Sequence, residues 1–259
     1  MLATSDILAL EPQLVRGWPP ERVVELYGWR CGLDRGVTRR ANSVWPLAWD
    51  GAAALDAAIG EAEAIYRSAG RRPCFRVMTG ARPAELDAAL AARGYASEGE
   101  SHVLVASPRV AAHPLPGIAG LAPALLAAPS AAWLACYQEG RTDEGESLAV
   151  RGLFARIAAP HVFAAASSGG RIASVALAVA TDGWVQVSAV RTLPEFRRRG
   201  LADLVLAAIF DWAPRQHARN LVLMVEASNR PALALYRKAG FRRVYDYHYR
   251  AKTPGDSPC

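Results

Sequence analysis

The clearest hydrophobic pattern lies in the C-terminal half of the chain. Two apolar runs, 161–166 and 171–180, are separated by Ser and Gly residues, and a third run, 184–190, follows the turn Thr181-Asp182-Gly183. An Asp-Gly pair between two β-prone runs is a strong hairpin signal, because both residues tolerate the positive φ angles that such turns need. We therefore predict an antiparallel meander of three strands over 161–190.

The pattern then changes to the helical period. Apolar residues recur at intervals of three and four from Leu201 to Trp212, which predicts a helix that ends near Pro214. A buried strand is predicted over 220–227, and a second helix follows, opened by the capping candidates Ser228 and Asn229 and closed at Gly240. Two more helices are predicted upstream, over 130–140 and 145–160.

The N-terminal half repeats part of this plan. It predicts a strand, a helix, a strand, a helix and a closing strand, over 41–47, 55–66, 74–80, 82–95 and 101–107. The segments RPAELDAALAARGY and RPALALYRKAGF both begin Arg-Pro-Ala, continue as helices and end in Gly and an aromatic residue. Internal duplication explains this, with chance similarity between two amphipathic helices as the alternative.

A proline-rich segment over 106–117 is the best linker candidate between the two halves. We therefore predict an α/β (α+β) protein with a first module over 1–108, a second over 113–251 and a polar tail over 252–259. The chain of 259 residues is long enough for two ordinary domains, and its 52% of hydrophobic residues argue against disorder.

Composition and charge exclude several classes of function. The formal net charge of +6 permits an anionic partner, but Lys and Arg are spread along the chain, which does not favour a nucleic-acid-binding module. Four distant cysteines form no CxxC pair, and five histidines lack metal-ligand spacing. No apolar run reaches membrane-spanning length, and the N-terminus lacks a basic n-region. We therefore expect a soluble cytoplasmic protein without a metal ion.

The one run of three basic residues, Arg197 to Arg199, precedes Gly200 at the start of a predicted helix, in EFRRRGLADL. The first turn of a helix leaves backbone N–H groups without partners and carries a partial positive charge, so it binds phosphate. Gly200 and Ala202 are small and permit close approach to the backbone, and arginines can neutralise a pyrophosphate. From these residues alone, a phosphate-bearing cofactor, a nucleic acid and a solvated loop all stay open.

Together with the second helix, these residues resemble the GNAT superfamily of acyl-CoA-dependent N-acyltransferases. RRRGLA is similar to its pyrophosphate loop, Gln/Arg-x-x-Gly-x-Gly/Ala, and NRPALALYRKAGF is similar to its later segment, with Asn229, Tyr236, Gly240 and Phe241 at the corresponding positions. The resemblance covers roughly 113–251. It implies two GNAT-like modules, each a mixed central sheet flanked by helices, and a tandem arrangement.

The resemblance also implies residue roles. Acetyl-CoA would be held at its pyrophosphate by the backbone amides of the loop, at its pantetheine arm by the end of the preceding strand, and near its thioester by Asn229. Tyr236 would protonate the departing thiolate, although a simple core role is the alternative. The implied cofactor-binding residues are Val190, Arg191, Thr192, Arg197, Arg198, Arg199, Gly200, Leu201, Ala202 and Asn229.

The first module resembles a degenerate GNAT module. Aligning Gly51 with Gly200 places Asp50 beside the glycine where the arginines would be, and aligning Gly94 with Gly240 places Leu90 at the position of Tyr236. Arg39, Arg40 and Asn42 are also notable. They could line the acceptor site, bridge the modules or be exposed residues at the end of a strand.

We therefore expect direct transfer of an acetyl group from acetyl-CoA to a primary amine, in a monomer or homodimer. The amine needs a base or a water relay, for which Glu226 and Glu139 are candidates, although both are better explained as surface carboxylates. A non-catalytic acyl-CoA or CoA sensor and a nucleic-acid-binding module are the other classes considered. The loops that select the acceptor carry no readable signature.

Overall fold

The computed structural model describes residues 3–36, 38–108, 123–140 and 143–252 of the chain. Its elements in chain order are α1 (Thr4–Arg16), β1 (Arg22–Leu26), β2 (Trp29–Leu33), η1 (Arg39–Ala41), β3 (Val44–Trp45), α2 (Leu55–Ser68), β4 (Cys74–Met78), α3 (Leu86–Ala92), β5 (Ala96–Ala106), β6 (Pro123–Leu126), α4 (Ala131–Gln138), α5 (Glu144–Ala155), β7 (His161–Ser168), β8 (Arg171–Thr181), β9 (Trp184–Thr192), η2 (Pro194–Phe196), α6 (Leu201–Trp212), η3 (Ala213–Gln216), β10 (Asn220–Glu226), α7 (Arg230–Lys238) and β11 (Arg242–Ala251).

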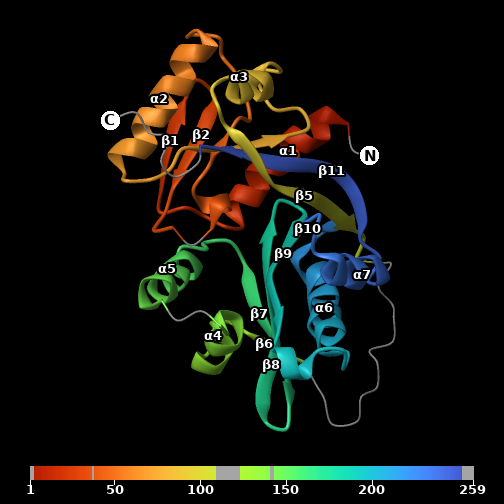
Figure 1. Cartoon of the computed structure of the whole chain (residues 1–259). Coiled ribbons are helices and arrows are strands. Elements are labelled where there is room, and N and C mark those ends of the chain that lie inside the picture. The colour runs from red at the N-terminus through yellow and green to blue at the C-terminus, as the bar shows by residue number, and fades with distance from the viewer. Residues whose placement is uncertain (1–2, 37, 109–122, 141–142, 253–259) are drawn as a thin grey trace.

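The strands of the described residues form one mixed sheet of eleven strands, flanked by helices (Figure 1). Its order is β1-β2-β3-β4-β11-β5-β10-β9-β8-β7-β6. This architecture confirms the predicted fold class. None of the helices in the described part of the chain is long and apolar enough to cross a membrane.

The C-terminal half follows the hydrophobic pattern closely. β7, β8 and β9 form the predicted antiparallel meander, and the turn between β8 and β9 places Asp182 at φ 40° and Gly183 at φ 82°. α6 buries the predicted apolar face against β6–β9, while α4 packs on β8 and β9. Figure 1 shows α4 and α5 on one side of these strands and α6 and α7 on the other. β8 is therefore buried on both faces from Ala173 to Thr181.

The two halves share strands in the middle of the sheet. β11, the last strand within the described residues, lies between β4 and β5 of the N-terminal half and pairs antiparallel with both. β5 in turn pairs antiparallel with β10. The sheet therefore runs without a break from one half to the other, and the module boundaries at 108 and 113 stay a prediction.

Some expectations from the sequence differ from the structure or lie outside the residues it describes. The strand predicted over 41–47 is reduced to Val44–Trp45, because residues 39–41 form the short helix η1. The first helix α1 and the strands β1, β2, β6 and β11 were not predicted from the sequence. Residues 109–117 of the linker candidate and 253–259 of the tail lie outside the described residues.

Candidate active site

A cavity opens where β9 and β10 diverge. The two strands pair in parallel only up to Val187 and Leu223, although β9 continues to Thr192 and β10 to Glu226. β9 carries a bulge at this point, with Ala189 at φ 52° and a register shift against β8. A bulge bends a strand and increases its twist, which separates β9 from its neighbour. The resulting cavity has a volume of about 990 Å³.

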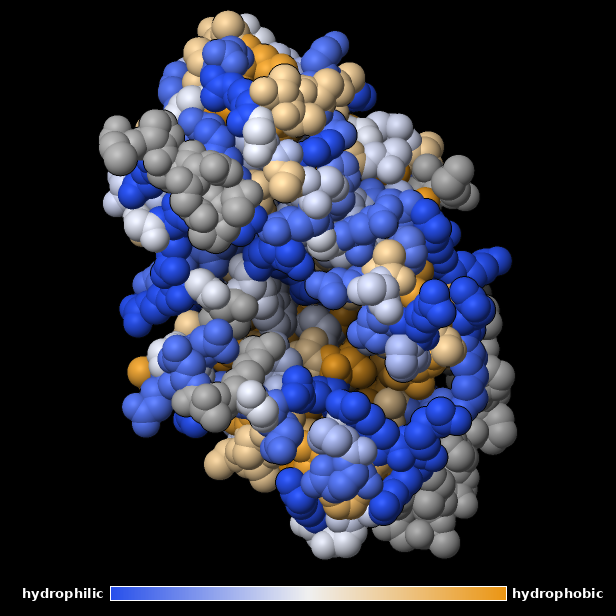
Figure 2. Space-filling model, in the orientation of Figure 1, coloured by the Kyte–Doolittle hydropathy of each residue, from blue (hydrophilic) through white to orange (hydrophobic). Residues whose placement is uncertain are grey.

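Six parts of the chain line this cavity: the bulged end of β9 with the loop after it, the first turn of α6, the end of β10, α7, one residue of α4 and one residue of η1. Figure 2 shows apolar residues inside a hollow over β9 and α6, with hydrophilic residues around its rim. The surface is therefore suited to a ligand with an apolar middle and charged ends.

The start of α6 forms one end of the cavity. Gly200 is the N-cap of this helix and has the left-handed conformation, at φ 75°, and no side chain caps the helix there. The first intrahelical hydrogen bond runs from the Leu204 amide to the Gly200 carbonyl, at 3.1 Å. The amides that precede Leu204 in the first turn are thus available to an anion. Arg197 and Arg198 line the cavity beside them.

Most of the predicted cofactor-binding residues line the cavity, but not all of them do. Ten were predicted, and the cavity is lined by nine of them: Val190, Arg191, Thr192, Arg197, Arg198, Gly200, Leu201, Ala202 and Asn229. Arg199 is not part of the lining, and its guanidinium lies 5.3 Å from the centre of the Phe196 ring. The Oδ1 atom of Asn229 accepts a hydrogen bond from the Ala232 amide at 3.2 Å, so this side chain also caps α7.

Tyr236 lies on the cavity wall, on the buried face of α7. Only 7% of the residue is exposed, and its ring packs edge-on against Phe241 at 5.9 Å between centroids. Burial raises the pKa of Tyr236 to about 12. The phenol therefore stays protonated at neutral pH and can donate a proton.

Two acidic residues line the cavity in the described part of the chain, and each has a cationic partner. Asp203, in the first turn of α6, pairs with Lys238 at 2.8 Å. Glu226, at the end of β10, pairs with Arg39 at 3.1 Å. Glu139, the other candidate base, does not line the cavity, and its backbone carbonyl accepts a hydrogen bond from Arg191.

Some residues that line the cavity carry no signal of this role in the sequence. The Ser188 hydroxyl is buried at the cavity wall and has no hydrogen-bond partner in the described residues. Tyr137 of α4 and Lys238 of α7 also line the cavity. The sequence carries no signal for the bulge that turns Ser188 toward this space, because Ala189 is not a residue that favours positive φ.

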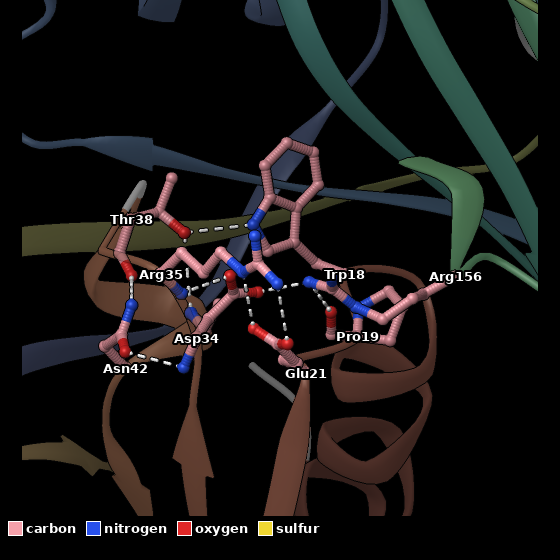
Figure 3. Close-up of polar contacts among 9 residues, drawn as sticks. Trp18, Pro19, Glu21, Asp34, Arg35, Thr38, Asn42 and Arg156 are labelled. Atoms are coloured by element: carbon pink, nitrogen blue, oxygen red, sulfur yellow. Dashed lines mark hydrogen bonds and ion pairs between the residues drawn. The ribbon is translucent and has the colours of Figure 1, made fainter. Parts of the chain in front are cut away.

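The structure places three residues singled out in the sequence, Arg39, Arg40 and Asn42, in three different environments. Arg39 bridges to the other half through Glu226, and Arg40 lines the cavity. Asn42 faces inward, where its Oδ1 atom accepts a hydrogen bond from the Asp34 amide at 2.8 Å. Figure 3 shows Asn42 and Asp34 in one network with Arg156 from the end of α5, which connects the two halves.

In the N-terminal half, the positions that correspond to the pyrophosphate loop and to Tyr236 are occupied by the protein's own side chains. The Asp50 carboxylate accepts a hydrogen bond from the Ala52 amide at 2.9 Å, so an acidic side chain already occupies that turn. Leu90 is fully buried in the core under α2 and α3. These contacts fit the interpretation of the N-terminal half as a GNAT-like module without the basic loop and without the tyrosine. That interpretation remains a prediction.

Comparison with known proteins gives the family. The family model described as "Probable histone acetyltransferase Rv0428c C-terminal" matches residues 4–250. An uncharacterized N-acetyltransferase, YobR, of Bacillus subtilis (strain 168) is 28% identical over 253 residues, which cover 95% of this chain and 99% of that protein. A mycothiol acetyltransferase of Clavibacter michiganensis subsp. michiganensis is 33% identical over 119 residues, covering 44% of this chain and 37% of that protein.

Two solved structures share the fold. The GCN5-related N-acetyltransferase from Kribbella flavida superposes with a TM-score of 0.72 at 20% identity and covers 98% of this chain and 97% of its own. A tandem GNAT protein from the clavulanic acid biosynthesis pathway superposes with a TM-score of 0.61 at 17% identity, over 78% of this chain and 70% of its own.

The chain therefore belongs to the Rv0428c acetyltransferase family of the GNAT superfamily. It is a GNAT-type acetyltransferase, which implies an acyl-CoA donor and an acceptor substrate.

Proposed function

We propose that this protein is an N-acetyltransferase that moves an acetyl group from acetyl-CoA to a primary amine. The observation that carries the proposal is the cavity between the diverging ends of β9 and β10. It has an uncapped helix terminus with two arginines at one end and a buried, protonated tyrosine on its wall.

The cavity residues fit a CoA thioester. The first-turn amides of α6 with Arg197 and Arg198 would hold the pyrophosphate, because helix termini and guanidinium groups both bind phosphate oxygens. The edge of β9 beyond Val187 no longer pairs with β10, so its main chain is free to bond the amides of an extended pantetheine arm. The Ser188 hydroxyl, which has no partner among the described residues, offers a further hydrogen bond inside the cavity.

In the proposed step the neutral amine attacks the thioester carbonyl carbon, a C–N bond forms and the C–S bond breaks. Tyr236 donates its proton to the thiolate that leaves. Because burial raises the pKa of Tyr236 to about 12, the phenol carries this proton at neutral pH. Main-chain amides of β9 near Val190 would stabilise the negative charge that develops on the carbonyl oxygen.

The amine must lose a proton, and Glu226 is the residue we propose to accept it, directly or through a water molecule. A lysine-like amine is only about one-thousandth neutral at pH 7, so a proton acceptor raises the reactive fraction. Asp203, the other acid in the lining, belongs to the first turn of α6 and pairs with Lys238 at the phosphate end. Glu226 stands on a different wall, at the end of β10.

Direct transfer is favoured over a covalent acyl-enzyme. The described residues that line the cavity include neither Cys nor His, so Ser188 has no histidine to activate it there. Cys136 of α4 is buried, and burial raises the pKa of its thiol to about 11. A thiol with this pKa is largely protonated at neutral pH and is a poor nucleophile.

Isothermal titration of acetyl-CoA into the wild type and into Gly200→Glu tests the proposal. The glutamate adds bulk and negative charge at the helix terminus, so micromolar binding by the wild type should be lost. Gly170→Glu is the matched control, because Gly170 also has positive φ, 76°, but lies in the β7–β8 turn with nothing within 4 Å of an added Cβ. Equal binding by Gly200→Glu, or none by the wild type, would refute the donor site.

Turnover separates the enzyme from a sensor. Release of CoA in the presence of a panel of primary amines is expected from the wild type and not from Gly200→Glu. Binding without CoA release from any amine would instead indicate an acyl-CoA sensor. Competition by nucleic acid that weakens steeply with salt would indicate a different use of the arginines.

A further inference from the structure

Arg40 is a cation of the N-terminal half that reaches into the cavity of the C-terminal half. It belongs to η1 and is half-buried, and it lines the cavity together with β9, β10 and α6. No other residue of the first hundred lines this cavity in the described part of the chain. The N-terminal half thus contributes one side chain to the site, and that side chain is charged.

Several contacts hold Arg40 in this position. Its guanidinium lies 5.1 Å from the centre of the Trp18 ring, and its carbonyl accepts a hydrogen bond from the Trp45 indole at 3.2 Å. Trp18 is itself fixed, since its indole donates to the Thr38 hydroxyl at 3.0 Å (Figure 3) and its ring packs edge-on against Phe154 of α5 at 5.9 Å. The guanidinium is therefore stacked on a rigid aromatic support.

Arg40 nevertheless has no carboxylate partner among the described residues, whereas its neighbour Arg39 has two. Arg39 pairs with Glu226 at 3.1 Å and with Glu98 at 3.5 Å. A guanidinium with a fixed position, partial burial and no acidic partner is prepared to bind an anion, because its planar fork matches carboxylate and phosphate oxygens.

The charges of the cavity support the same conclusion. Its two acids are both paired, Asp203 with Lys238 and Glu226 with Arg39. Arg197 and Arg198 stand at the phosphate end beside α6. Arg191 is the remaining cation of the lining, and its contact to the Glu139 carbonyl places it next to the end of α4. The buried Nε atom of Arg191 has no hydrogen-bond partner in the described residues.

Arg40 stacks on Trp18, which packs against Phe154 of α5, and Arg191 contacts the carbonyl of Glu139 directly after α4, so both arginines adjoin α4 and α5. Figure 1 shows these two helices on the opposite side of the strands from α6. Because the proposed place of the donor phosphates is the first turn of α6, this side of the cavity is left for the acceptor. We propose that Arg40, with Arg191, binds an anionic group on the acceptor, so that the enzyme acetylates small amines that carry a carboxylate or a phosphate. This inference rests on the proposed acetyl transfer to an amine.

The same charges would repel a lysine-rich peptide. A basic acceptor would bring further positive charge against two arginines that lack acidic partners in the described part of the chain, and the acids that line the cavity there are already paired. The name of the family model mentions histones. Turnover of a histone-tail peptide in place of anionic amines would therefore contradict the proposal.

Matched acceptor pairs test the proposal. CoA release is measured with β-alanine and β-alaninamide, with glycine and glycinamide, and with O-phosphoethanolamine and ethanolamine. The amine of each carboxamide is the less basic of its pair, so intrinsic availability of neutral amine favours the carboxamide. One of the two anionic groups, carboxylate or phosphate, should be preferred. For acceptors with that group, we expect kcat/KM to exceed that of the neutral partner by about 10- to 100-fold, the range for a charge-assisted hydrogen bond. The carboxylate and phosphate pairs distinguish the two anionic groups.

Variants of Arg40 test whether this residue causes the preference for anionic over neutral acceptors. Arg40→Gln should reduce the anionic-to-neutral ratio of kcat/KM toward one through the acceptor KM, and Arg40→Lys should retain part of the ratio because it keeps the charge. Arg30→Gln is the matched control, since Arg30 lies on β2, pairs with Glu25 on the surface and should leave every ratio unchanged. Arg40→Lys also serves if Arg40→Gln fails to fold.

Three outcomes would overturn the proposal. One is a wild type that turns over both members of every pair equally. Another is an Arg40→Gln variant that raises the KM of acetyl-CoA while keeping the acceptor ratio, which would assign Arg40 to the donor. The last is turnover of a lysine-rich histone-tail peptide, or of neutral amines, with none of an anionic amine. In each case intact acetyl-CoA binding that Gly200→Glu abolishes would leave the donor site standing, so the two failures are distinguishable.

Discussion

Arg39 of η1 donates a hydrogen bond from its Nη2 atom to Oε1 of Glu226, at 3.1 Å, across the boundary between the two halves of the chain. Glu226 is the last residue of β10 and lines the cavity. The Glu226 side chain is 57% exposed, so water reaches it and can relay a proton. An arginine of the N-terminal half thereby holds in place the carboxylate that we propose as the proton acceptor.

Replacement of the Glu226 carboxylate should slow the chemical step. Glu226→Gln keeps the size of the side chain and removes its ability to accept a proton, so we expect kcat at pH 7 to fall by about 100-fold, within the usual range for acid–base catalysis. The residual activity should rise more steeply with pH, because the amine must then lose its proton to solvent. Steady-state rates from pH 6 to 9.5 measure both effects.

Glu139→Gln is the control for this measurement, because Glu139 was the other candidate from the sequence and does not line the cavity. Its kcat should stay within about twofold of the wild type. An unchanged kcat in Glu226→Gln at every pH would exclude Glu226 as the acceptor and leave water alone in that role.

The role of Tyr236 predicts a separate loss. Tyr236→Phe keeps the edge-on packing against Phe241 and removes only the hydroxyl, so acetyl-CoA binding and thermal stability should stay close to those of the wild type. We expect kcat to fall by about 100-fold or more, because the thiolate then leaves without a proton donor. Since the pKa of Tyr236 is raised to about 12, the wild type should show no loss of rate from tyrosine ionisation below about pH 10.

Titration calorimetry of acetyl-CoA separates this effect from a damaged binding site. A Tyr236→Phe variant with wild-type kcat would mean that the tyrosine is only part of the core, the alternative that the sequence leaves open. A variant that loses acetyl-CoA binding would instead assign the hydroxyl to holding the donor.

The sequence predicts the C-terminal half of this fold well because its signals are local. The Asp182-Gly183 turn, the three-four spacing from Leu201 to Trp212 and the position of Gly200 each depend on neighbours in the chain. The first helix was missed although Ile7, Leu10 and Leu14 follow the helical spacing and are buried. Pro12 and the buried Glu11 interrupt that apolar pattern.

The rest of the site depends on contacts between distant segments. No local pattern places β11 between β4 and β5, and no pattern states that η1 reaches the end of β10. The sequence leaves open whether Arg40 lines the acceptor site, bridges the modules or is an exposed strand-end residue, and its place at the cavity depends on the packing of Trp18 against α5. The bulge at Ala189 likewise follows from the tertiary arrangement and not from the residue itself.

The contacts between Asp87 of α3 and the strand β11 should contribute to stability in a pH-dependent way. Asp87 of α3 accepts hydrogen bonds from Arg250 at 2.7 Å and pairs with His248 at 3.0 Å, both on β11. The hydrogen bond from Arg250, with that from His248, lowers the pKa of the Asp87 carboxyl. A carboxyl with a lowered pKa in the folded state stabilises the protein above its unfolded pKa, near 3.9, and this contribution disappears as the pH falls through the folded pKa.

Asp87→Asn should therefore lower the free energy of unfolding at pH 7 by about 1 kcal/mol, the upper range for a pair that is partly exposed to solvent. The difference between variant and wild type should vanish at a pH below the folded pKa of Asp87, because its carboxyl is then neutral in both states. Urea titrations at pH 7, 4 and 2.5 follow the difference. A constant difference at all three values would mean that Asp87 acts through packing or helix capping instead of through its charge.

The buried pair of Glu11 and Arg76 offers the sharpest test of the core under α1. Both side chains are fully buried, and the Glu11 carboxylate also accepts a hydrogen bond from the Tyr245 hydroxyl at 2.6 Å. The Arg76 guanidinium lies 3.8 Å from the centre of the Tyr247 ring and 4.4 Å from that of Trp45. This cluster joins α1, β4 and β11, so it ties the first and last elements of the chain together.

Glu11→Leu should lower the free energy of unfolding by about 3–5 kcal/mol, because it leaves the Arg76 charge buried without a partner. The double variant with Glu11→Leu and Arg76→Met removes both charges, so it should be more stable than Glu11→Leu alone. Glu25→Gln breaks the exposed pair with Arg30 and should change stability by less than about 1 kcal/mol. Urea unfolding of the wild type, Glu11→Leu, Arg76→Met, the double variant and Glu25→Gln tests this prediction: a double variant that loses as much stability as the two single variants together would show that the two side chains stabilise the fold by packing, and not as an ion pair.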